Sequence, residues 1–178
     1  LVVEGTIRHT DREIQGCTDN AEQIAFRRGA IEAWLLENHI SLDDLSAVVI
    51  RSSGAGLCKK GGTYLVTGKL RDGMYAAYRG SFPKAPHPSF IVLPLADEIL
   101  GSRPVPIYIV DPDGVDEFQD VAYITGHPDL PRSSGFHVLN HKAIARKASR
   151  DLGKRYEDAD LVVAHMGGGI SIAAHRHG

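Results

Sequence analysis

The sequence predicts an α/β fold with a largely parallel sheet. Short apolar, β-favouring runs alternate along the chain with longer stretches of helical spacing, and this alternation is typical of parallel strands connected by helices. The 178 residues are 43% hydrophobic and 24% charged, which are ordinary values for a globular protein. A chain of this length is expected to form one domain, or one domain and part of another.

Helices are expected where apolar residues recur at helical spacing between end signals. Ile24 and Ile31 recur on one face of a helix that Asp19 or Asn20 can cap and that ends near Asn38. Three further stretches have helical character and lie over residues 87–100, 115–126 and 136–153. The last two end at a glycine, which is a common helix stop.

Proline shapes the stretch over residues 87–100. Pro88 suits the first turn of a helix, whereas Pro94 must kink the helix or force it to start late. His87 immediately precedes this stretch. From the local residues alone, His87 is expected to be a surface-loop histidine.

Strands are expected over short apolar runs that are bounded by small or breaking residues. They lie over residues 47–51, within 59–66, and over 105–111, 161–166 and 170–174. Arg51, Asp111 and His165 stand at or near the ends of three separate strands. Ligands of parallel sheets collect at the carboxyl ends of the strands, so this coincidence favours a functional interpretation of all three residues.

A run of three glycines follows His165. Gly167, Gly168 and Gly169 have no Cβ, so the backbone can approach another group closely. Consecutive N–H groups can form a concave nest that suits a phosphate. A flexible hairpin loop that joins two strands explains the same glycines equally well on the local sequence.

Other polar residues also have two interpretations each. The Asp111 carboxylate is a hard oxygen ligand that suits Mg²⁺ carrying nucleotide phosphates, and the alternative is a helix cap. Arg51 can hold a carboxylate or a phosphate with its planar fork, or it can be a solvated strand-end arginine. His137 and His141 lie four residues apart on one helical face. We do not expect zinc there, because the sequence shows no metalloprotease glutamate between them and no third ligand.

Composition and charge exclude several classes of protein. The net charge of −2 predicts neither nucleic acid nor an anionic membrane as a partner. Cys17 and Cys58 are too few for a disulfide framework and match no metal spacing, which indicates a cytoplasmic protein. No apolar stretch approaches the ~20 residues of a membrane span. The chain lacks an initiating Met and its last strand candidate runs to its end, so we expect a piece of a longer protein.

The segment that begins "IVDPDGVDEF" and ends "AHMGGGIS" closely resembles the butyrate kinases of the acetate kinase family, and the likeness covers nearly all of residues 105–174. "VEGTIRHT" and "GGTY" resemble weaker, earlier parts of the family pattern. The resemblance implies an actin-like, ribonuclease-H-like fold of two domains. Residues 1–150 would then be an incomplete first domain, and residues 151–178 the opening strands of the second.

The resemblance also implies roles for individual residues. His165 and Gly167–Gly169 match the family's second phosphate loop, so they would bind the phosphates of ATP or ADP. Asp111 matches the aspartate near Mg²⁺, and His137 matches the histidine that donates to the phosphoryl group in flight. On the substrate side, Arg51 is the nearest match to the arginine that holds the carboxylate. His87 in "HPSF" resembles a family position near the substrate.

The expected function is therefore that of a butyrate kinase, which converts a short-chain carboxylate and ATP to an acyl phosphate and ADP, and the reverse. A non-catalytic remnant or binding fragment is one alternative. An acetate or propionate kinase is another, although this chain has "FHVLNH" where acetate kinases carry "FHGTSH". We expect the chain alone to be inactive and to form homo-oligomers, because missing neighbours would leave unpaired strand edges.

Overall fold

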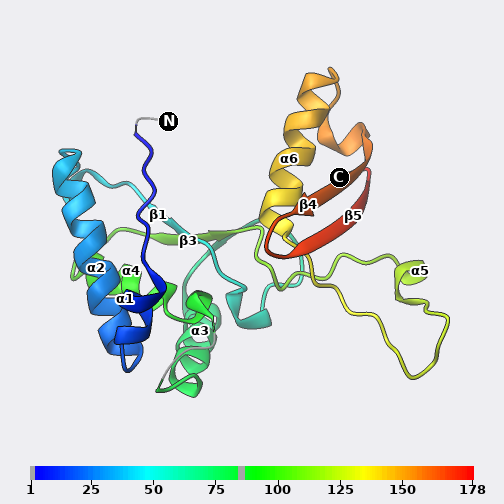
Figure 1. The fold of residues 1–178 in the computed structure, drawn as a ribbon. Coiled ribbons are helices and arrows are strands. Elements are labelled where there is room, and N and C mark those ends of the chain that lie inside the picture. The colour runs from blue at the N-terminus through cyan, green and yellow to red at the C-terminus, as the bar shows by residue number, and fades with distance from the viewer. Residues whose placement is uncertain (1–2, 84–86) are drawn as a thin grey trace. The chain divides into compact units, whose positions relative to one another are not determined.

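The computed structural model describes residues 3–83 and 87–178 (Figure 1). Its contacts divide the chain into two compact units. Unit 1 comprises the described residues of Leu1–Ala55 and Tyr64–Ile109, and unit 2 comprises Gly56–Thr63 and Val110–Gly178. This division falls near residue 110 rather than at residue 150. The assignment of 1–150 and 151–178 to two actin-like domains stays a prediction.

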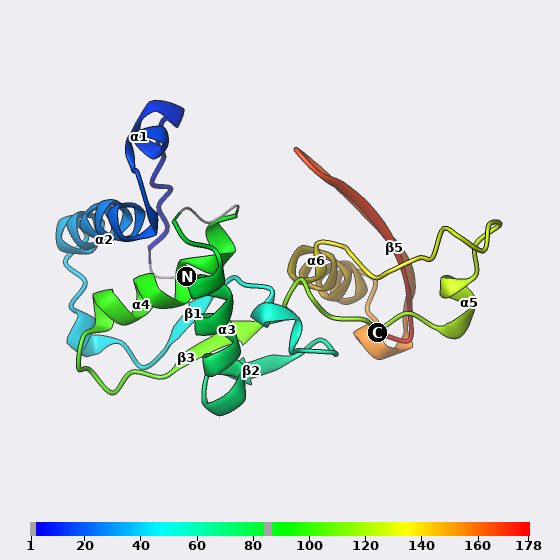
Figure 2. The ribbon, with the colours of Figure 1, turned by 90° about the horizontal axis from the view of Figure 1, so that it is seen from below.

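Unit 1 is built around a small sheet. The strand order is β1 (Val48–Ile50), β3 (Ile107–Val110) and β2 (Thr63–Leu65), as Figure 2 shows from below. β1 and β3 run parallel, with Val48 opposite Ile107 and Ile50 opposite Ile109. The parallel pairing that the sequence predicts is confirmed for these two strands.

Helices of unit 1 cover one face of this sheet (Figures 1 and 2). They are α3 (Gly68–Gly80) and α4 (Val92–Leu100), and α2 (Asn20–Glu37) packs on α4. Between helices and sheet lies an apolar core that contains Val66, Met74, Leu93, Ala96, Leu100, Ile107 and Ile109. The short helix α1 (Asp11–Gly16) precedes α2 and begins with a capping box formed by Thr10 and Glu13.

The end signals of α2 and α4 explain where these helices begin. Asp19 accepts a hydrogen bond from the N–H of Glu22 and caps α2, as the sequence predicts. Pro94 is the third residue of α4 and so lies in its first turn, where an N–H has no partner within the helix. The helix therefore starts late and is not kinked by Pro94.

Unit 2 is built around one long helix and a hairpin, with a long loop that contains the short helix α5 (Asp120–Tyr123). α6 (Val138–Asp151) packs against β4 (Asp160–Met166), which pairs antiparallel with β5 (Ile170–Arg176). The three glycines form the loop of this hairpin, so the hairpin interpretation of the sequence is confirmed as a matter of geometry. Arg51 and Asp111 follow β1 and β3 of one sheet, as expected, whereas β4 pairs with β5, so His165 lies in a different sheet.

The prediction of a helix over residues 115–126 is wrong in extent, because the observed helix is much shorter. Only α5 (Asp120–Tyr123) forms there. The Asp116 carboxylate accepts from the N–H of Phe118, and the N–H of Asp116 donates to the carbonyl of Lys59. Such local and long-range bonds compete with helical ones, and they hold the first part of the stretch in a loop. α1 and α3 are further helices that our sequence analysis did not predict.

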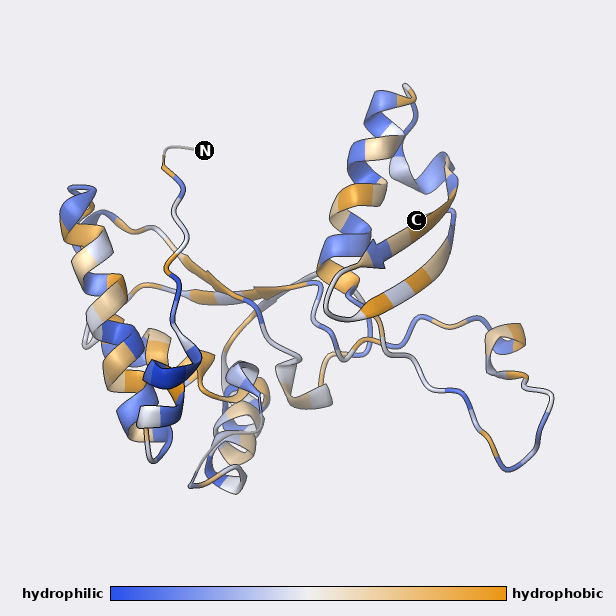
Figure 3. Ribbon diagram, in the orientation of Figure 1, coloured by the Kyte–Doolittle hydropathy of each residue, from blue (hydrophilic) through white to orange (hydrophobic). Residues whose placement is uncertain are grey.

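The two faces of the hairpin differ in character. One face packs towards α6 and carries Leu161, Val163, His165, Ser171, Ala173 and His175. The other is exposed and, apart from the terminal pair Asp160 and Arg176, apolar. We call its apolar part the apolar hairpin face; it comprises Val162, Ala164, Met166, Ile170, Ile172 and Ala174 (Figure 3). The predicted self-association stays a prediction. Within residues 3–83 and 87–178, no helix is long and apolar enough to cross a membrane.

Candidate functional site

Asp111 follows β3 and is held from both sides of its carboxylate. The residue is 1% exposed. Its Oδ1 accepts from the N–H of Gly62 at 2.8 Å, and its Oδ2 accepts from Nη1 of Arg146 at 2.9 Å. The backbone φ of Asp111 is +43°, a left-handed value that Asp and Asn tolerate better than most residues. The carboxylate is thus fixed in direction by a backbone donor and a guanidinium.

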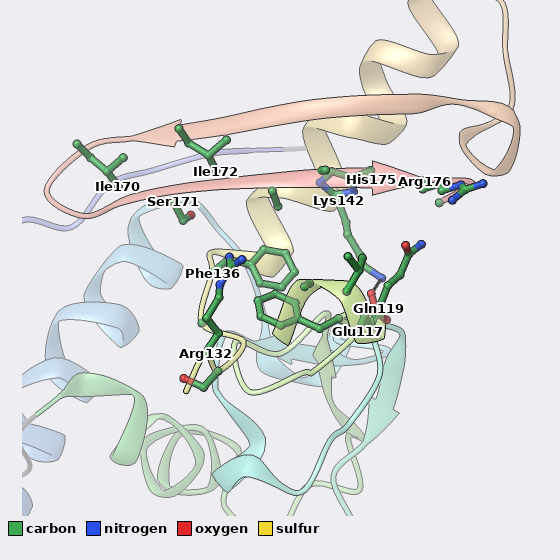
Figure 4. A pocket seen from close by; sticks show the side chains of 18 of the residues that line it. Glu117, Gln119, Arg132, Phe136, Lys142, Ile170, Ser171, Ile172, His175 and Arg176 are labelled. Atoms are coloured by element: carbon green, nitrogen blue, oxygen red, sulfur yellow. Dashed lines mark ion pairs between the residues drawn. The ribbon is translucent and has the colours of Figure 1, made fainter. Parts of the chain in front are cut away.

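A second, partly buried ion pair lies beside Asp111. Nζ of Lys142 lies 2.7 Å from Oε2 of Glu117, and Oε1 of Glu117 accepts from the N–H of Gly61 at 2.5 Å. Burial opposes ionisation of Glu117, but the hydrogen bonds from Lys142 and Gly61 outweigh it, so the pKa of this carboxyl is lowered. Figure 4 shows Lys142 and Glu117 meeting at one side of a pocket.

Glycine at position 61 lets the main chain approach both ion pairs closely. A Cβ there would lie 2.3 Å from Nζ of Lys142 and 2.9 Å from Oδ1 of Asp111, so these side chains would have to shift. The segment Gly56–Thr63 therefore passes directly over both ion pairs. The two pairs and this segment form one connected polar network, which we call the acidic bracket (Asp111, Glu117, Lys142, Arg146 and Gly61).

Two histidine rings stack beneath the glycine loop. His137 lies at the N-cap of α6 and His165 lies near the end of β4. Their ring centroids are 3.8 Å apart, and the rings are parallel to within 5°. Nδ1 of His137 contacts Oγ of Ser171 at 2.8 Å, and Nδ1 of His165 contacts Nδ2 of Asn140 at 2.8 Å. Each ring is thus held through Nδ1, which leaves Nε2 as the nitrogen that can meet a ligand.

The glycine loop lies close to the Nε2 edges of both rings. A Cβ on Gly169 would lie 3.3 Å from Cε1 and 3.4 Å from Nε2 of His137, and a Cβ on Gly167 would lie 3.6 Å from Nε2 of His165. The N–H of Gly167 donates to the carbonyl of Gly169 at 3.1 Å. We therefore expect the N–H groups of Gly168 and Gly169 to be those that face an anion. Glycine at position 169 lets the main chain approach His137.

Two further histidines lie deeper in unit 2. His141 is completely buried, and its Nε2 contacts Oγ of Ser171 at 2.8 Å. His175 is 8% exposed, and its Nδ1 contacts the hydroxyl of Tyr156 at 2.8 Å. Burial is the main cause that lowers the pKa of both histidines, and neighbouring histidines lower it further. Both rings are therefore neutral at neutral pH.

A pocket of about 610 Å³ opens beside the inner face of β5. Phe136, Lys142, Tyr156, Ser171 and His175 are among the residues that line it. Figure 4 shows Ile170 and Ile172 projecting from β5 on the side opposite to Ser171. The pocket thus borders His175 and the Lys142–Glu117 pair, and Ile170, Ile172 and Ala174 of β5 also contribute to its lining.

The structure distributes the expected site residues over both units. Asp111, His137, His165 and the glycine loop lie in unit 2, where the loop and the two rings come together. Arg51 and His87 lie in unit 1 and are exposed. His87 caps the 3₁₀ turn Pro88–Phe90, because its Nδ1 accepts from the N–H of Ser89 at 3.2 Å.

Metal binding can be tested against the residues present. In the described part of the chain, no group of three or more His, Cys, Asp or Glu side chains is placed to hold a metal ion. His137 and His141 both contact Ser171. Mg²⁺ commonly takes only one or two carboxylates and completes its shell with water and phosphate oxygens. The Asp111 carboxylate fits such a partial role, provided that Arg146, whose side chain is 45% exposed, turns aside.

Several polar residues of this site were missed in the sequence analysis. Lys142, Glu117, Ser171 and Asn140 were not singled out. A signal for Lys142 was present, because it falls within the helical stripe of α6 that Val138, Ala145 and Ser149 define, and all of these are buried. A lysine in such a stripe indicates a buried ion pair.

Comparisons with known proteins give one consistent result. The Acetokinase family model matches residues 127–178. The chain is 40% identical over 179 residues to "Butyrate kinase 1" of Clostridium acetobutylicum, with 99% of this chain and 48% of that protein covered. It is 39% identical over 180 residues to a "Probable butyrate kinase" of Listeria monocytogenes, with 100% and 48% covered. The chain therefore spans about half the length of these curated relatives.

Solved structures of acetate kinases share part of the fold. The Porphyromonas gingivalis enzyme matches with a TM-score of 0.57 and 19% identity, covering 77% of this chain and 35% of that one. The Entamoeba histolytica enzyme matches with a TM-score of 0.52 and 16% identity, covering 84% and 38%. At these identities the likeness concerns the mixed α/β fold alone.

Proposed function

We propose that this chain, a homologue of the butyrate kinases in the acetate kinase family, carries part of the active site of a carboxylate phosphotransferase. The proposed reaction transfers the terminal phosphoryl group of ATP to butyrate, which gives butyryl phosphate and ADP, and it also runs in reverse. The observation that carries the proposal is the 40% identity to a butyrate kinase over 99% of the chain. Identity to the acetate kinase structures is 19% or less, so butyrate is the acceptor we propose.

The stacked histidines supply the chemistry that phosphoryl transfer needs. Catalysis of this reaction depends on positioning and on neutralising the charge of the phosphoryl oxygens. Nε2 of His165 and the N–H groups of Gly168 and Gly169 would bind nucleotide phosphates. Nε2 of His137 would donate to the phosphoryl group during transfer. Both rings are held through Nδ1, so little reorganisation is required when the anion arrives.

Asp111 is the residue that would hold Mg²⁺ carried by the nucleotide. When bound, this ion would neutralise charge on the phosphate groups. The N–H of Gly62 orients the carboxylate, and Arg146 balances its charge. On the acceptor side, the Arg51 guanidinium would hold the carboxylate of butyrate in a bidentate contact, and His87 would lie near it.

A segment graft tests this function. Residues 1–178 replace the matching segment of the Clostridium acetobutylicum enzyme, and butyryl phosphate is trapped as the hydroxamate. We expect activity in the graft, and we expect His137→Ala to lower kcat about a hundredfold with a smaller change in KM, as loss of one preorganised donor does. His39→Asn in unit 1 is the control and should leave both constants unchanged. A folded graft without activity, or an unchanged kcat in His137→Ala, contradicts the proposal.

A further inference from the structure

Ser171 is the meeting point of three nitrogen atoms. Its Oγ lies 2.8 Å from Nδ1 of His137, 2.8 Å from Nε2 of His141 and 3.4 Å from the backbone nitrogen of His137. A serine hydroxyl has one hydrogen to donate and two lone pairs to accept with. The backbone N–H of His137 is a donor in every case. One of the two rings must therefore donate to Oγ, and the other must accept from it.

These constraints leave two arrangements for a pair of neutral rings. In the first, Nε2–H of His141 donates to Ser171, and the hydroxyl donates to Nδ1 of His137. The hydrogen of the His137 ring is then on Nε2. In the second, Nδ1–H of His137 donates to Ser171, the hydroxyl donates to Nε2 of His141, and the hydrogen of His141 is then on Nδ1. The hydroxyl is equally satisfied in both.

The surroundings of His141 decide between the two arrangements. Nδ1 of His141 is buried and has no hydrogen-bond partner within the described residues. The second arrangement would place an N–H at this position, and buried N–H groups without partners are the rarer and more costly kind of unpaired group in proteins. The first arrangement leaves only an unpaired lone pair there. It is therefore favoured, and the His137 ring carries its hydrogen on Nε2.

An independent contact determines the tautomer of His165, the other ring of the stack. Nδ2 of Asn140 lies 2.8 Å from Nδ1 of His165. An amide nitrogen can only donate, so Nδ1 of His165 accepts and the hydrogen of that ring is on Nε2. The two parallel rings thus reach the same tautomer through different partners.

We propose that Ser171, backed by His141, and Asn140 are positioning residues that fix His137 and His165 as Nε2–H tautomers. Two ring donors then stand side by side at the glycine loop, where they match an anion with several oxygen acceptors. That the anion is a nucleotide phosphate rests on the proposed function; the tautomers themselves do not. The fixed hydrogens favour the anion, because a bare ring nitrogen facing a phosphate oxygen would be repulsive.

The experiment uses the 178-residue chain with ¹⁵N-labelled histidine, at a pH well above the ordinary histidine pKa of about 6.5. Nuclear magnetic resonance of the ring nitrogens then separates protonated from bare nitrogen in each ring. We expect Nε2–H at both His137 and His165. Ser171→Ala should convert His137 to a mixture of tautomers without affecting His165, and Ser171→Thr, which keeps the hydroxyl, should restore the single tautomer.

Asn140→Asp is the matched variant for the second ring. A carboxylate can only accept, so the hydrogen of His165 should move to Nδ1 while His137 stays unchanged. The amide signals of α6, β4 and β5 report whether unit 2 remains folded in each variant. Nδ1–H at His137 in the unmodified chain, or a His137 tautomer that Ser171→Ala does not alter in a folded chain, would overturn the inference.

Addition of ATP with Mg²⁺ to the unmodified chain separates this inference from the proposed function. If both rings are Nε2–H tautomers and ATP shifts their ring-nitrogen signals, both the inference and the proposed function are supported. If both rings are Nε2–H and respond to Ser171→Ala and Asn140→Asp as expected, but ATP leaves them unperturbed, the inference is supported and the nucleotide is the wrong anion. The two claims can therefore fail separately.

Discussion

Unit 1 and unit 2 bury different kinds of side chain. The core of unit 1 is aliphatic, and the buried polar residues recorded there are neutral: Asn20, Gln23 and Ser52. Unit 2 has a much smaller apolar cluster of Ala145, Tyr156 and Val163. Its buried polar residues include four that can be charged, namely Asp111, His141, Lys142 and His175.

This difference separates a structural role from a chemical one. Apolar burial is the main favourable term in folding, whereas buried charges cost desolvation energy that their pairing only partly returns. Unit 2 retains such groups next to the glycine loop and a pocket, so they are better explained by chemistry at that site than by stability. Changes in unit 1 should then act on stability, and changes in unit 2 should act more on binding.

The largest loss of stability is expected from the apolar core of unit 1. Leu93 is 1% exposed, so Leu93→Ala removes buried methyl groups and leaves a cavity. We expect a loss of about 3 kcal/mol in the free energy of unfolding. Trp34 is the only tryptophan in the chain and lies in α2, so its fluorescence in a urea titration reports on unit 1. A loss below about 1 kcal/mol would show that this core is not packed as described.

A smaller loss is expected from the acidic bracket of unit 2. Lys142→Met leaves Glu117 without its cation, but Glu117 is about one-third exposed, so we expect about 2 kcal/mol rather than the larger value for a fully buried pair. The double variant Lys142→Met with Glu117→Gln should recover most of the loss. Hydrogen exchange of the β4 and β5 amides measures the stability of unit 2 in both variants.

An exposed ion pair on the same helix is the control for Lys142. Lys147 and Asp151 are about two-thirds exposed, so Lys147→Met should cost less than about 0.5 kcal/mol. Equal effects at positions 142 and 147 would mean that the bracket is not a buried network. A double variant as unstable as the single one would show that the pair contributes net stability, against the contrast between the two units.

The helices differ in how far the sequence predicts them. α2 was predicted because Asp19 caps it and apolar residues recur along it, and α6 because its pattern is strongly periodic. α3 was missed because Gly68, Gly73 and Gly80 are poor helix formers and Thr67 makes no side-chain cap bond. A helix is therefore predicted where its own residues supply a cap and apolar periodicity, and it is missed where they do not.

The site was predicted in part, and the missing part depends on long-range contacts. His137, His165 and the glycines were identified from a motif, and the structure brings them together. The partners of these rings were not identified, because Ser171 lies 34 residues from His137 and Asn140 lies 25 residues from His165. Only the register of β5 and the rotation of α6 bring such pairs into contact.

A pH-dependent loss of stability is expected from the buried histidines. Their pKa is lowered in the folded chain, chiefly by burial, below the ordinary value of 6.5. As pH falls below 6.5, the unfolded chain takes up protons that the folded chain does not, so the free energy of unfolding decreases. Glu117 adds to the pH dependence of the free energy of unfolding only at lower pH, because its pKa is lowered from 4.5.

Urea titrations between about pH 8 and pH 5 isolate this histidine effect. His141→Gln should reduce the pH dependence, whereas His39→Asn, at an exposed position in unit 1, should not change it. A midpoint that stays constant over this range would show that the buried rings titrate as they do in water.

The smallest effect on stability, with a larger one on binding, is expected in the glycine loop. Gly169→Ala places a Cβ 3.3 Å from His137, so the ring or the loop must shift by a few tenths of an ångström. We expect a loss of less than about 1 kcal/mol in stability, since the loop is exposed, and severalfold weaker binding of ATP with Mg²⁺. Gly126→Ala, outside the loop, meets no atom within 4 Å of the described structure and is the control. Equal binding in both variants would contradict the close approach.

The most direct test of the account is a titration of the unmodified chain with ADP and Mg²⁺, followed through its histidine ring signals. The account predicts saturable shifts of His137 and His165 at up to about 10 mM nucleotide, a range that includes weak binding. His39 in unit 1 should not shift. Saturation confined to the stacked pair would show that the polar interior of unit 2 serves phosphate binding. Rings that stay unchanged over that range, or shifts of equal size at His39, would contradict it.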